Sequence, residues 1–180
     1  MLRRATLLLG FVTLGSLAEA VPLRVGEAER AELEALARRF YESTRDGVRT
    51  PAEVFPTREE LRALFARADG VTAPRAVADA GAGGGAAMGD AVVTHQLTAI
   101  DRDVRALRER FQGGTFRGLA GPAVTERALR QRGCGRFARA DAVCADGLML
   151  EYQVGSETRR FRIDTLVRIG RRWRILDVRN

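Results

Sequence analysis

The C-terminal part of the chain alternates apolar and polar residues with a period of two, and this pattern limits the fold more than any other feature. The alternation runs through residues 148–154 and 158–169, and a further strand-like segment follows at 172–178. Two-residue turns, Gly155-Ser156 and Gly170-Arg171, separate these segments. Alternation with short turns is typical of antiparallel strands that bury one face. We therefore predict an antiparallel meander with one packed face.

The N-terminal half has helical periodicity instead. Apolar residues share one face of residues 27–44, and the capping box Thr57-x-x-Glu60 marks the start of a second helix. The longest helix is expected at 92–111, and a short helix is expected within 122–133. The fold class is therefore α+β, with N-terminal helices packed on one face of a C-terminal curved antiparallel meander sheet.

Residues 70–90 are rich in glycine and alanine and have no periodicity, so we expect a flexible loop inside a single domain. Within this loop, residues 81–86 match the G-x-G-x-x-A pattern of dinucleotide-binding sites. Such a site needs a buried strand before its first glycine. Residues 71–80 contain no β-branched run to form that strand, so we attribute the match to low complexity.

The order of elements resembles the nuclear transport factor 2-like (SnoaL-like) superfamily. The resemblance rests on helices followed by a strand such as Phe161–Ile169 and a last Arg-Trp-Arg-Ile-Leu-Asp-Val strand, and it covers residues 27–68 and 146–180. It implies a cone-shaped sheet backed by helices, with a pocket between the two layers. Exported members of the superfamily include ligand-binding proteins and some enzymes. The glycine-rich loop and the long helix differ from the usual layout.

Residues 1–20 have the layout of a secretory signal peptide. Arg3 and Arg4 precede a short apolar run, and Ala18-Glu19-Ala20 is an A-x-A cleavage site. The run is shorter than the roughly 20 residues that cross a bilayer, although an uncleaved anchor is an alternative. We therefore predict one α+β domain at 21–180, exported to the periplasm or the cell exterior, with no integral membrane segment after cleavage.

The charged residues exclude several classes of function. All 30 basic residues are Arg, and the net charge is +7. An exported protein seldom meets nucleic acid, so we expect no nucleic-acid partner and attribute the arginines to codon composition. The absence of Lys excludes a P-loop and a pyridoxal imine. One His and two Cys cannot complete a closed zinc site, so neither a metal nor another cofactor is predicted.

Two residues are candidates for a general base. His95 is the single histidine, and its alternative role is that of a surface or capping residue near a helix start. Asp177 shares the parity of Trp173 on the packed face if the last strand is regular. Leu176 and Val178 are apolar on the opposite parity, so a bulge or burial of both faces is equally expected. The alternative role of Asp177 is to pair with an arginine.

The alternation also predicts a binding pocket. Tyr152, Thr165 and Trp173 are expected on the inner, helix-facing side of the sheet, and together with Asp177 they would line a partly apolar pocket. Such a pocket suits a small apolar or amphipathic ligand.

A basic surface is predicted on the opposite face. Arg160, Arg162 and Arg168 alternate with apolar residues, so we expect them to face solvent. This face is suited to an anionic partner such as a phosphate-bearing envelope surface. The alternative is an outer sheet face that charge merely keeps solvated.

The two cysteines are expected to form a Cys134–Cys144 disulfide, as exported chains favour pairing. A continuous strand between them would separate the residues by roughly 33 Å. The bond therefore requires residues 134–144 to fold back; otherwise both thiols stay free.

These observations favour an exported, non-catalytic ligand-binding or accessory protein with a pocket between helices and sheet. One alternative is a SnoaL-like enzyme that uses Asp177 or His95 as general base. Another is an interaction protein that uses the arginine-rich sheet face.

Overall fold

A computed structural model of the 180-residue chain describes residues 21–22, 25–48, 52–65, 85–120, 130–132, 134 and 142–178, with backbone alone for 21–22, 85–88 and 130–132. The predicted signal peptide at 1–20 and most of the predicted loop at 70–90 lie outside the described residues. No helix of the described part is long and apolar enough to cross a membrane.

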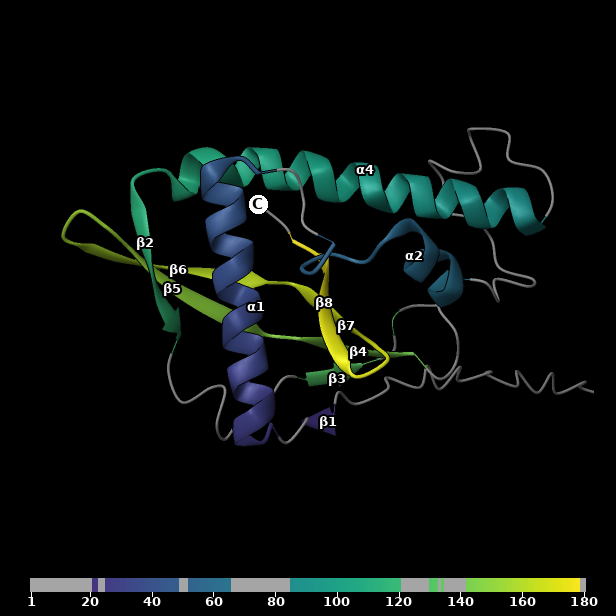
Figure 1. Ribbon diagram of the computed structural model, residues 1–180, viewed down its shortest axis with the longest axis horizontal. Helices are drawn as coiled ribbons and strands as arrows, with labels where there is room; N and C mark the ends of the chain where they lie inside the picture. Colours follow the sequence, from purple (N-terminus) through teal and green to yellow (C-terminus); the bar gives the residue numbers. More distant parts are fainter. Residues whose placement is uncertain are drawn as a thin grey trace, which may run out of the picture.

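Three helices match the predicted helical segments (Figure 1). Helix α1 spans Glu27–Asp46 and ends at Gly47, whose positive φ of 69° closes the last turn. Helix α2 spans Arg58–Phe65, and its capping box forms as predicted: the Glu60 amide donates to Thr57 Oγ1 at 3.1 Å, and the Thr57 amide donates to the Glu60 carboxylate at 2.8 Å.

Helix α4 spans Gly85–Phe111 and is longer than predicted. Its first residues lie in the segment expected to be a loop, so the loop boundary at residue 90 was wrong. Ala86, Ala87 and Met88 are strong helix formers, and their preference offsets the cost of the neighbouring glycines.

In the described part of the chain, eight strands form two antiparallel sheets. The five-stranded sheet has the order β1-β3-β4-β7-β8, and the three-stranded sheet has the order β2-β5-β6. Their bounds are β1 Val21–Pro22, β2 Gly114–Leu119, β3 Arg130–Arg132, β4 Val143–Asp146, β5 Leu148–Val154, β6 Glu157–Ile163, β7 Thr165–Ile169 and β8 Arg172–Asp177. Helices in the N-terminal half and antiparallel sheets in the C-terminal part confirm the α+β class.

The strand expected at 158–169 is divided at Asp164, so β6 and β7 belong to different sheets. The pairing register nevertheless continues across the division, because Ala145 pairs with Leu166 and Leu148 pairs with Ile163. β4 with β5 and β6 with β7 thus form the two arms of one long hairpin, which bends at Gly147 and Asp164 and belongs to both sheets. The predicted curvature is concentrated at this bend, where Gly147 has a φ of 96°.

Residues 130–132 form a strand, so the short helix expected within 122–133 does not extend to its predicted end. These residues pair with both β1 and β4. Ladder pairing in the sheet therefore overrides the local helical pattern.

The main core lies between α1, the C-terminal half of α4 and both sheets. Aromatic rings fill it, with neighbouring centroids 4.8–6.0 Å apart. The rings belong to Phe40, Tyr41, Phe55, Phe111, Phe116, Tyr152 and Phe161. α1 thereby covers one face of the curved sheet, as the sequence pattern predicts.

A second cluster covers the other face of β4, β7 and β8, beneath α2 and the N-terminal part of α4. Neighbouring residues of one strand enter opposite clusters: Ile175 belongs to the main core and Leu176 to the second. The register shifts between Thr165 and Leu166, which pair with Asp177 and Ile175. Leu176 is the extra residue of this bulge. Both structural alternatives proposed for the last strand, a bulge and burial of both faces, are therefore present.

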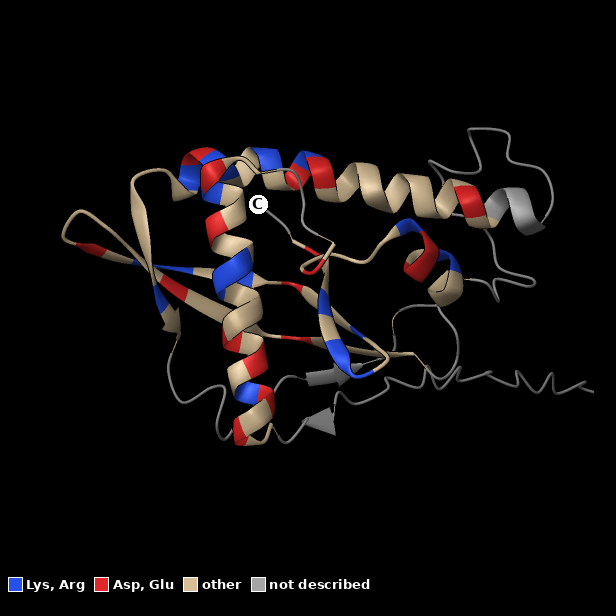
Figure 2. Cartoon of the chain, in the orientation of Figure 1, with Lys and Arg blue, Asp and Glu red and all other residues tan. Residues whose placement is uncertain are grey.

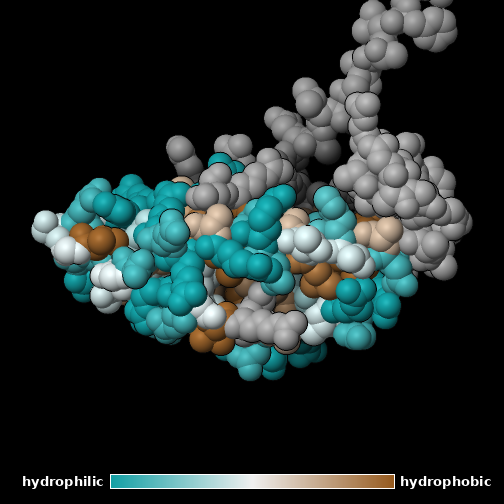
Figure 3. All heavy atoms as spheres, turned by 90° about the horizontal axis from the view of Figure 1, so that it is seen from above, coloured by the Kyte–Doolittle hydropathy of each residue, from teal (hydrophilic) through white to brown (hydrophobic). Residues whose placement is uncertain are grey.

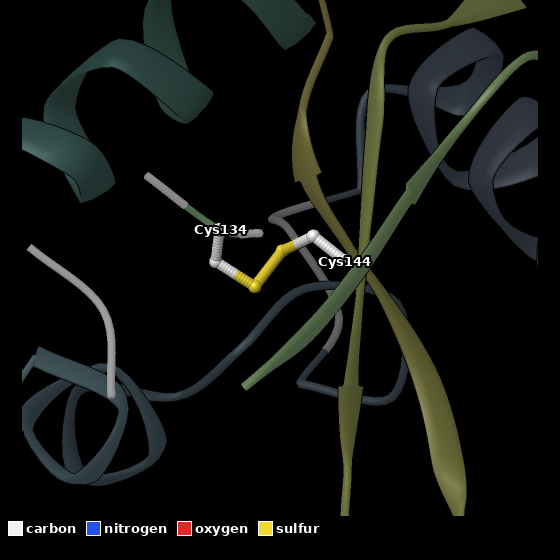
Figure 4. The surroundings of a disulfide bond; sticks show 2 residues. All are labelled: Cys134 and Cys144. Carbon is white, nitrogen blue, oxygen red and sulfur yellow. A yellow bond between two sulfur atoms is a disulfide. The ribbon is translucent and has the colours of Figure 1, made fainter. Parts of the chain in front are cut away.

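Cys134 and Cys144 form the predicted disulfide, with Cα atoms 5.1 Å apart (Figure 4). The chain folds back because β3 and β4 pair antiparallel, with Arg132 opposite Cys144. Cys144 is completely buried in the second cluster, so the disulfide holds Cys134, the residue at which the chain turns back, against that cluster.

Candidate functional site

The four residues predicted to line a ligand pocket do not meet in one cavity. Tyr152 and Trp173 are 0% and 1% exposed, which confirms that they face inward, but they belong to different sheets. Tyr152 packs against Tyr41 in the aromatic core. Thr165 is buried as predicted and pairs with Asp177 across the bulge. Of four surface pockets formed by the described residues, none is lined by Tyr152, Thr165 or Asp177.

The two predicted general bases lie apart from those pockets as well. His95 is exposed on α4, and Asp177 is half-buried at the end of β8. The hydrogen bond from Arg102 to Asp103 is the main reason that the pKa of Arg102 is raised, and the charge of Asp177 raises it a little further. Among the described residues, no group of three or more His, Cys, Asp or Glu side chains is arranged to hold a metal ion.

The arginines on the outer face of the three-stranded sheet are neutralised by neighbouring carboxylates. Arg160 contacts Glu151 at 3.2 Å, and Arg162 contacts Asp146 at 3.5 Å. Both arginines are exposed, as predicted. Their pairing nevertheless leaves this face with little excess charge to attract a partner.

Arg168 is exposed as predicted, but it does not share a face with Arg160. Its guanidinium lies 3.7 Å from Glu29 of α1 and 5.8 Å from the centroid of the Trp173 ring. The expected grouping of three arginines was wrong because the hairpin bends at Asp164 between them. Arg168 therefore lies on the α1 side of the five-stranded sheet.

The most basic of these four pockets lies between α1 and β8. It has a volume of about 500 Å³, and we call it the arginine groove. Its lining residues are Glu32, Leu36, Arg39, Glu53, Arg171, Arg172, Trp173 and Arg174. Figure 2 shows basic residues along β8 and its hairpin with β7.

Local structure fixes both walls of the groove. On α1, Glu32, Leu36 and Arg39 follow helical spacing and lie on one face. The Trp173 amide donates to Glu32 Oε1 at 3.1 Å, and the Ile175 amide donates to the Val54 carbonyl at 2.8 Å. These bonds cover the free edge of β8 and hold α1 and the segment after it against that strand.

Trp173 forms the floor of the arginine groove and is buried. Its ring nitrogen donates to Glu29 Oε1 at 2.8 Å, and the residue is 1% exposed. Leu36 beside it is also buried. Most of the accessible atoms of the groove therefore belong to charged side chains.

The arginines of the groove exceed its carboxylates. Arg39 contacts Glu53 at 3.6 Å, whereas Arg171 and Arg172 are exposed and form no ion pair with any described residue. The Arg174 side chain is only 13% exposed, yet its nearest carboxylate, on Glu60, is 3.9 Å away. Its Nε has no hydrogen-bond partner among the described residues.

Sequence reasoning did not select Arg39, Arg171 or Arg174 as site residues. The signal available was the Gly-Arg-Arg-Trp-Arg sequence at 170–174, where three arginines surround the single tryptophan. Nothing in that sequence indicates that α1 would supply the opposite wall.

Comparisons with known proteins do not assign this chain to a family. No protein-family model, curated protein or solved structure gives a significant match. The resemblance to the nuclear transport factor 2-like superfamily therefore stays a prediction.

Proposed function

We propose that this protein is an exported, non-catalytic binding protein that holds a phosphate-bearing envelope component in the arginine groove. The observation that carries the proposal is the positive charge of one hairpin: Arg171 and Arg172 form no ion pair with a described residue, and Arg174 has only one long contact, with Glu60. A poorly paired, mostly buried guanidinium is costly, and an anion in the groove would offset that cost.

The chemistry of the groove favours phosphate over an apolar ligand. Guanidinium groups bind phosphate and carboxylate oxygens with two parallel hydrogen bonds. Because Leu36 and Trp173 are closed beneath the charged side chains, an apolar group would find little accessible surface. Tyr152 is packed among the rings of the aromatic core and lines none of the four pockets. An amphipathic lipid with an anionic headgroup fits better than a wholly apolar molecule.

Two features support the proposed export of the protein from the cytosol. Residues 1–20 have the layout of a signal peptide, and disulfides persist mainly in oxidising compartments outside the cytosol. A phosphate-bearing envelope surface is available there.

Fluorescence of the single tryptophan gives a direct test, since Trp173 lies at the floor of the groove. We expect vesicles containing phosphatidylglycerol, but not phosphatidylcholine alone, to change the emission in a saturable and salt-sensitive way. Free pyrophosphate is the second probe. An emission change with pyrophosphate indicates a soluble phosphate compound as ligand, whereas a change with vesicles alone indicates a lipid surface.

Charge reversal locates the interaction. The double variant Arg171→Glu, Arg172→Glu should weaken binding by about tenfold or more, since charged hydrogen bonds are lost. The double variant Arg160→Glu, Arg162→Glu makes the same change in net charge on the other sheet and should bind almost normally. Equal loss in both variants, or no response to either probe, would contradict the proposal.

A further inference from the structure

Another pocket lies where the C-terminal end of α1 meets the C-terminal half of α4. It has a volume of about 420 Å³, and we call it the α1–α4 pocket. Small-molecule sites commonly occupy about 300–1,000 Å³. Thr44, Gly47 and Val48 line it from the end of α1, and α4 supplies Asp101, Val104, Arg105 and Arg108. It shares no residue with the arginine groove.

The most deeply buried polar group of this pocket has no partner. Thr44 is 1% exposed and lies on the buried face of α1. Its Oγ1 forms no hydrogen bond with any described residue. A buried hydroxyl without a partner destabilises a fold, so a ligand atom that accepts its proton would offset this cost.

A guanidinium without a counter-charge lies at the same pocket. Arg108 is exposed and forms neither an ion pair nor a hydrogen bond with the described part of the chain. Its position is defined by Gly47, because a Cβ atom on that glycine would lie 2.5 Å from Arg108 Cζ. The guanidinium therefore rests on the C-terminal end of α1, and its N–H groups stay available to a ligand.

The charges of the pocket favour a singly charged anion. Arg105 and Arg108 face one carboxylate, that of Asp101, so the lining has one net positive charge. Arg105 lies 3.8 Å from Asp101, which leaves Arg108 to neutralise a ligand. A phosphate dianion would bring excess negative charge close to Asp101.

The remaining lining is apolar. Val48 is 58% exposed and is the one large apolar side chain found exposed in the described part of the chain. Val104 is partly buried and packs against the main core. An apolar group of a ligand would remove part of this surface from water.

We propose that the α1–α4 pocket binds a small organic monocarboxylate with a short apolar body. A carboxylate has two acceptor oxygens and no donor, so it can accept from both the Thr44 hydroxyl and the Arg108 guanidinium. The apolar body would lie against Val48 and Val104. This site is separate from the arginine groove and takes a different class of anion.

The test uses the whole mature protein and isovalerate as the probe. Binding is followed through the methyl ¹H–¹³C signals of Val48 and Val104, with those of Val143 in β4 as an internal control. The control ligand is isovaleramide, which keeps the apolar body and lacks the charge. We expect saturable shifts with isovalerate and at least tenfold weaker binding of the amide. Equal binding of the two, or no saturable shift with isovalerate, would overturn the proposal.

Variants of Thr44 examine the buried hydroxyl. Thr44→Val replaces it with a methyl group of similar size, so it should weaken isovalerate binding about tenfold while unfolding in urea at the same or a higher midpoint. Thr44→Ser keeps the hydroxyl and should bind almost normally. Unchanged binding in Thr44→Val, or equal loss in Thr44→Val and Thr44→Ser, would overturn the proposal.

Charge variants examine Arg108 independently, even if Thr44→Val fails to fold. Arg108→Gln should weaken isovalerate binding at least tenfold. Arg102→Gln makes the same change in charge on α4 outside the pocket and should bind normally. Equal loss in these two variants would overturn the proposal. Arg171→Glu with Arg172→Glu should leave isovalerate binding unchanged, so each pocket can fail without the other.

Discussion

Arg174 combines deep burial with weak compensation. Its guanidinium donates to the Trp173 carbonyl at 3.3 Å, but its closest carboxylate is 3.9 Å away. Replacing such a charge with an apolar group of similar length is often neutral or stabilising. We therefore expect Arg174→Met to unfold in urea at the same or a higher midpoint while binding phosphatidylglycerol vesicles more weakly. A fall of about 2 kcal/mol in the free energy of unfolding would assign Arg174 a structural role instead.

Tyr41 should make stability sensitive to alkaline pH. Burial raises the pKa of this phenol, and the charge of Arg45 lowers it by less. Because the folded pKa exceeds the unfolded value of about 10, the contribution to stability is complete below that pH and is lost as pH rises through the folded pKa.

The variant Tyr41→Phe isolates this effect. It loses a 3.3 Å hydrogen bond to the Phe111 carbonyl, so it should be somewhat less stable at neutral pH. Above about pH 10, its free energy of unfolding should fall less steeply than that of the original protein. Urea denaturation at several alkaline pH values checks this, and parallel pH profiles would refute it.

At the scale of elements, the capping box of α2 gives a quantitative prediction. Thr57→Ala removes the oxygen that accepts from the Glu60 amide and should cost about 1 kcal/mol. Thr98→Ala, at an exposed position within α4, is the matched control and should change stability by less than about 0.5 kcal/mol. Urea denaturation distinguishes them, and equal effects would mean that the cap does not stabilise the fold.

Elements with a strong local signal were predictable from the sequence. The helix at 27–44, the capping box at Thr57 and the strand at 148–154 match α1, α2 and β5 closely. β1, β2, β3 and β4 were missed. β1, β3 and β4 are only two to four residues long and are defined by pairing with distant residues, and β2 begins at the second of two consecutive glycines. Periodicity reports which side chains are buried, not which backbone segments pair.

The bend at Asp164 explains why the basic surface was predicted only in part. Period-two alternation assigns Arg160 and Arg168 to one face when the strand is continuous. The structure changes sheet between them, so exposure was predicted correctly and the shared face was not. The arginine groove also needs α1 beside β8, a contact that no local pattern encodes.

At the scale of the whole molecule, little broad apolar surface is seen on the face that carries α4. Figure 3 shows mostly hydrophilic atoms there, with hydrophobic atoms in small separate patches among the described residues. On this face, polar and charged contacts are therefore more available to a partner than apolar ones.

The disulfide should contribute strongly to global stability. It closes a loop with a sequence separation of 10, and constraint of the unfolded chain by such a loop contributes about 3 kcal/mol. The double variant Cys134→Ala, Cys144→Ala should lose about that amount in urea denaturation, and the reduced original protein should lose nearly as much. Titration should find no free thiol in the oxidised, denatured protein, and two thiols would contradict the assigned bond.

The central claim is that an anion binds in the arginine groove, and ¹H–¹⁵N NMR can test it by showing which arginines the anion contacts. Pyrophosphate is titrated while the arginine Nε–Hε signals and the single indole signal of Trp173 are followed. We predict saturable shifts at Arg171, Arg172, Arg174 and the indole, with little change at Arg160 and Arg162. Shifts spread evenly over all arginines, or confined to the β6 face, would contradict the account.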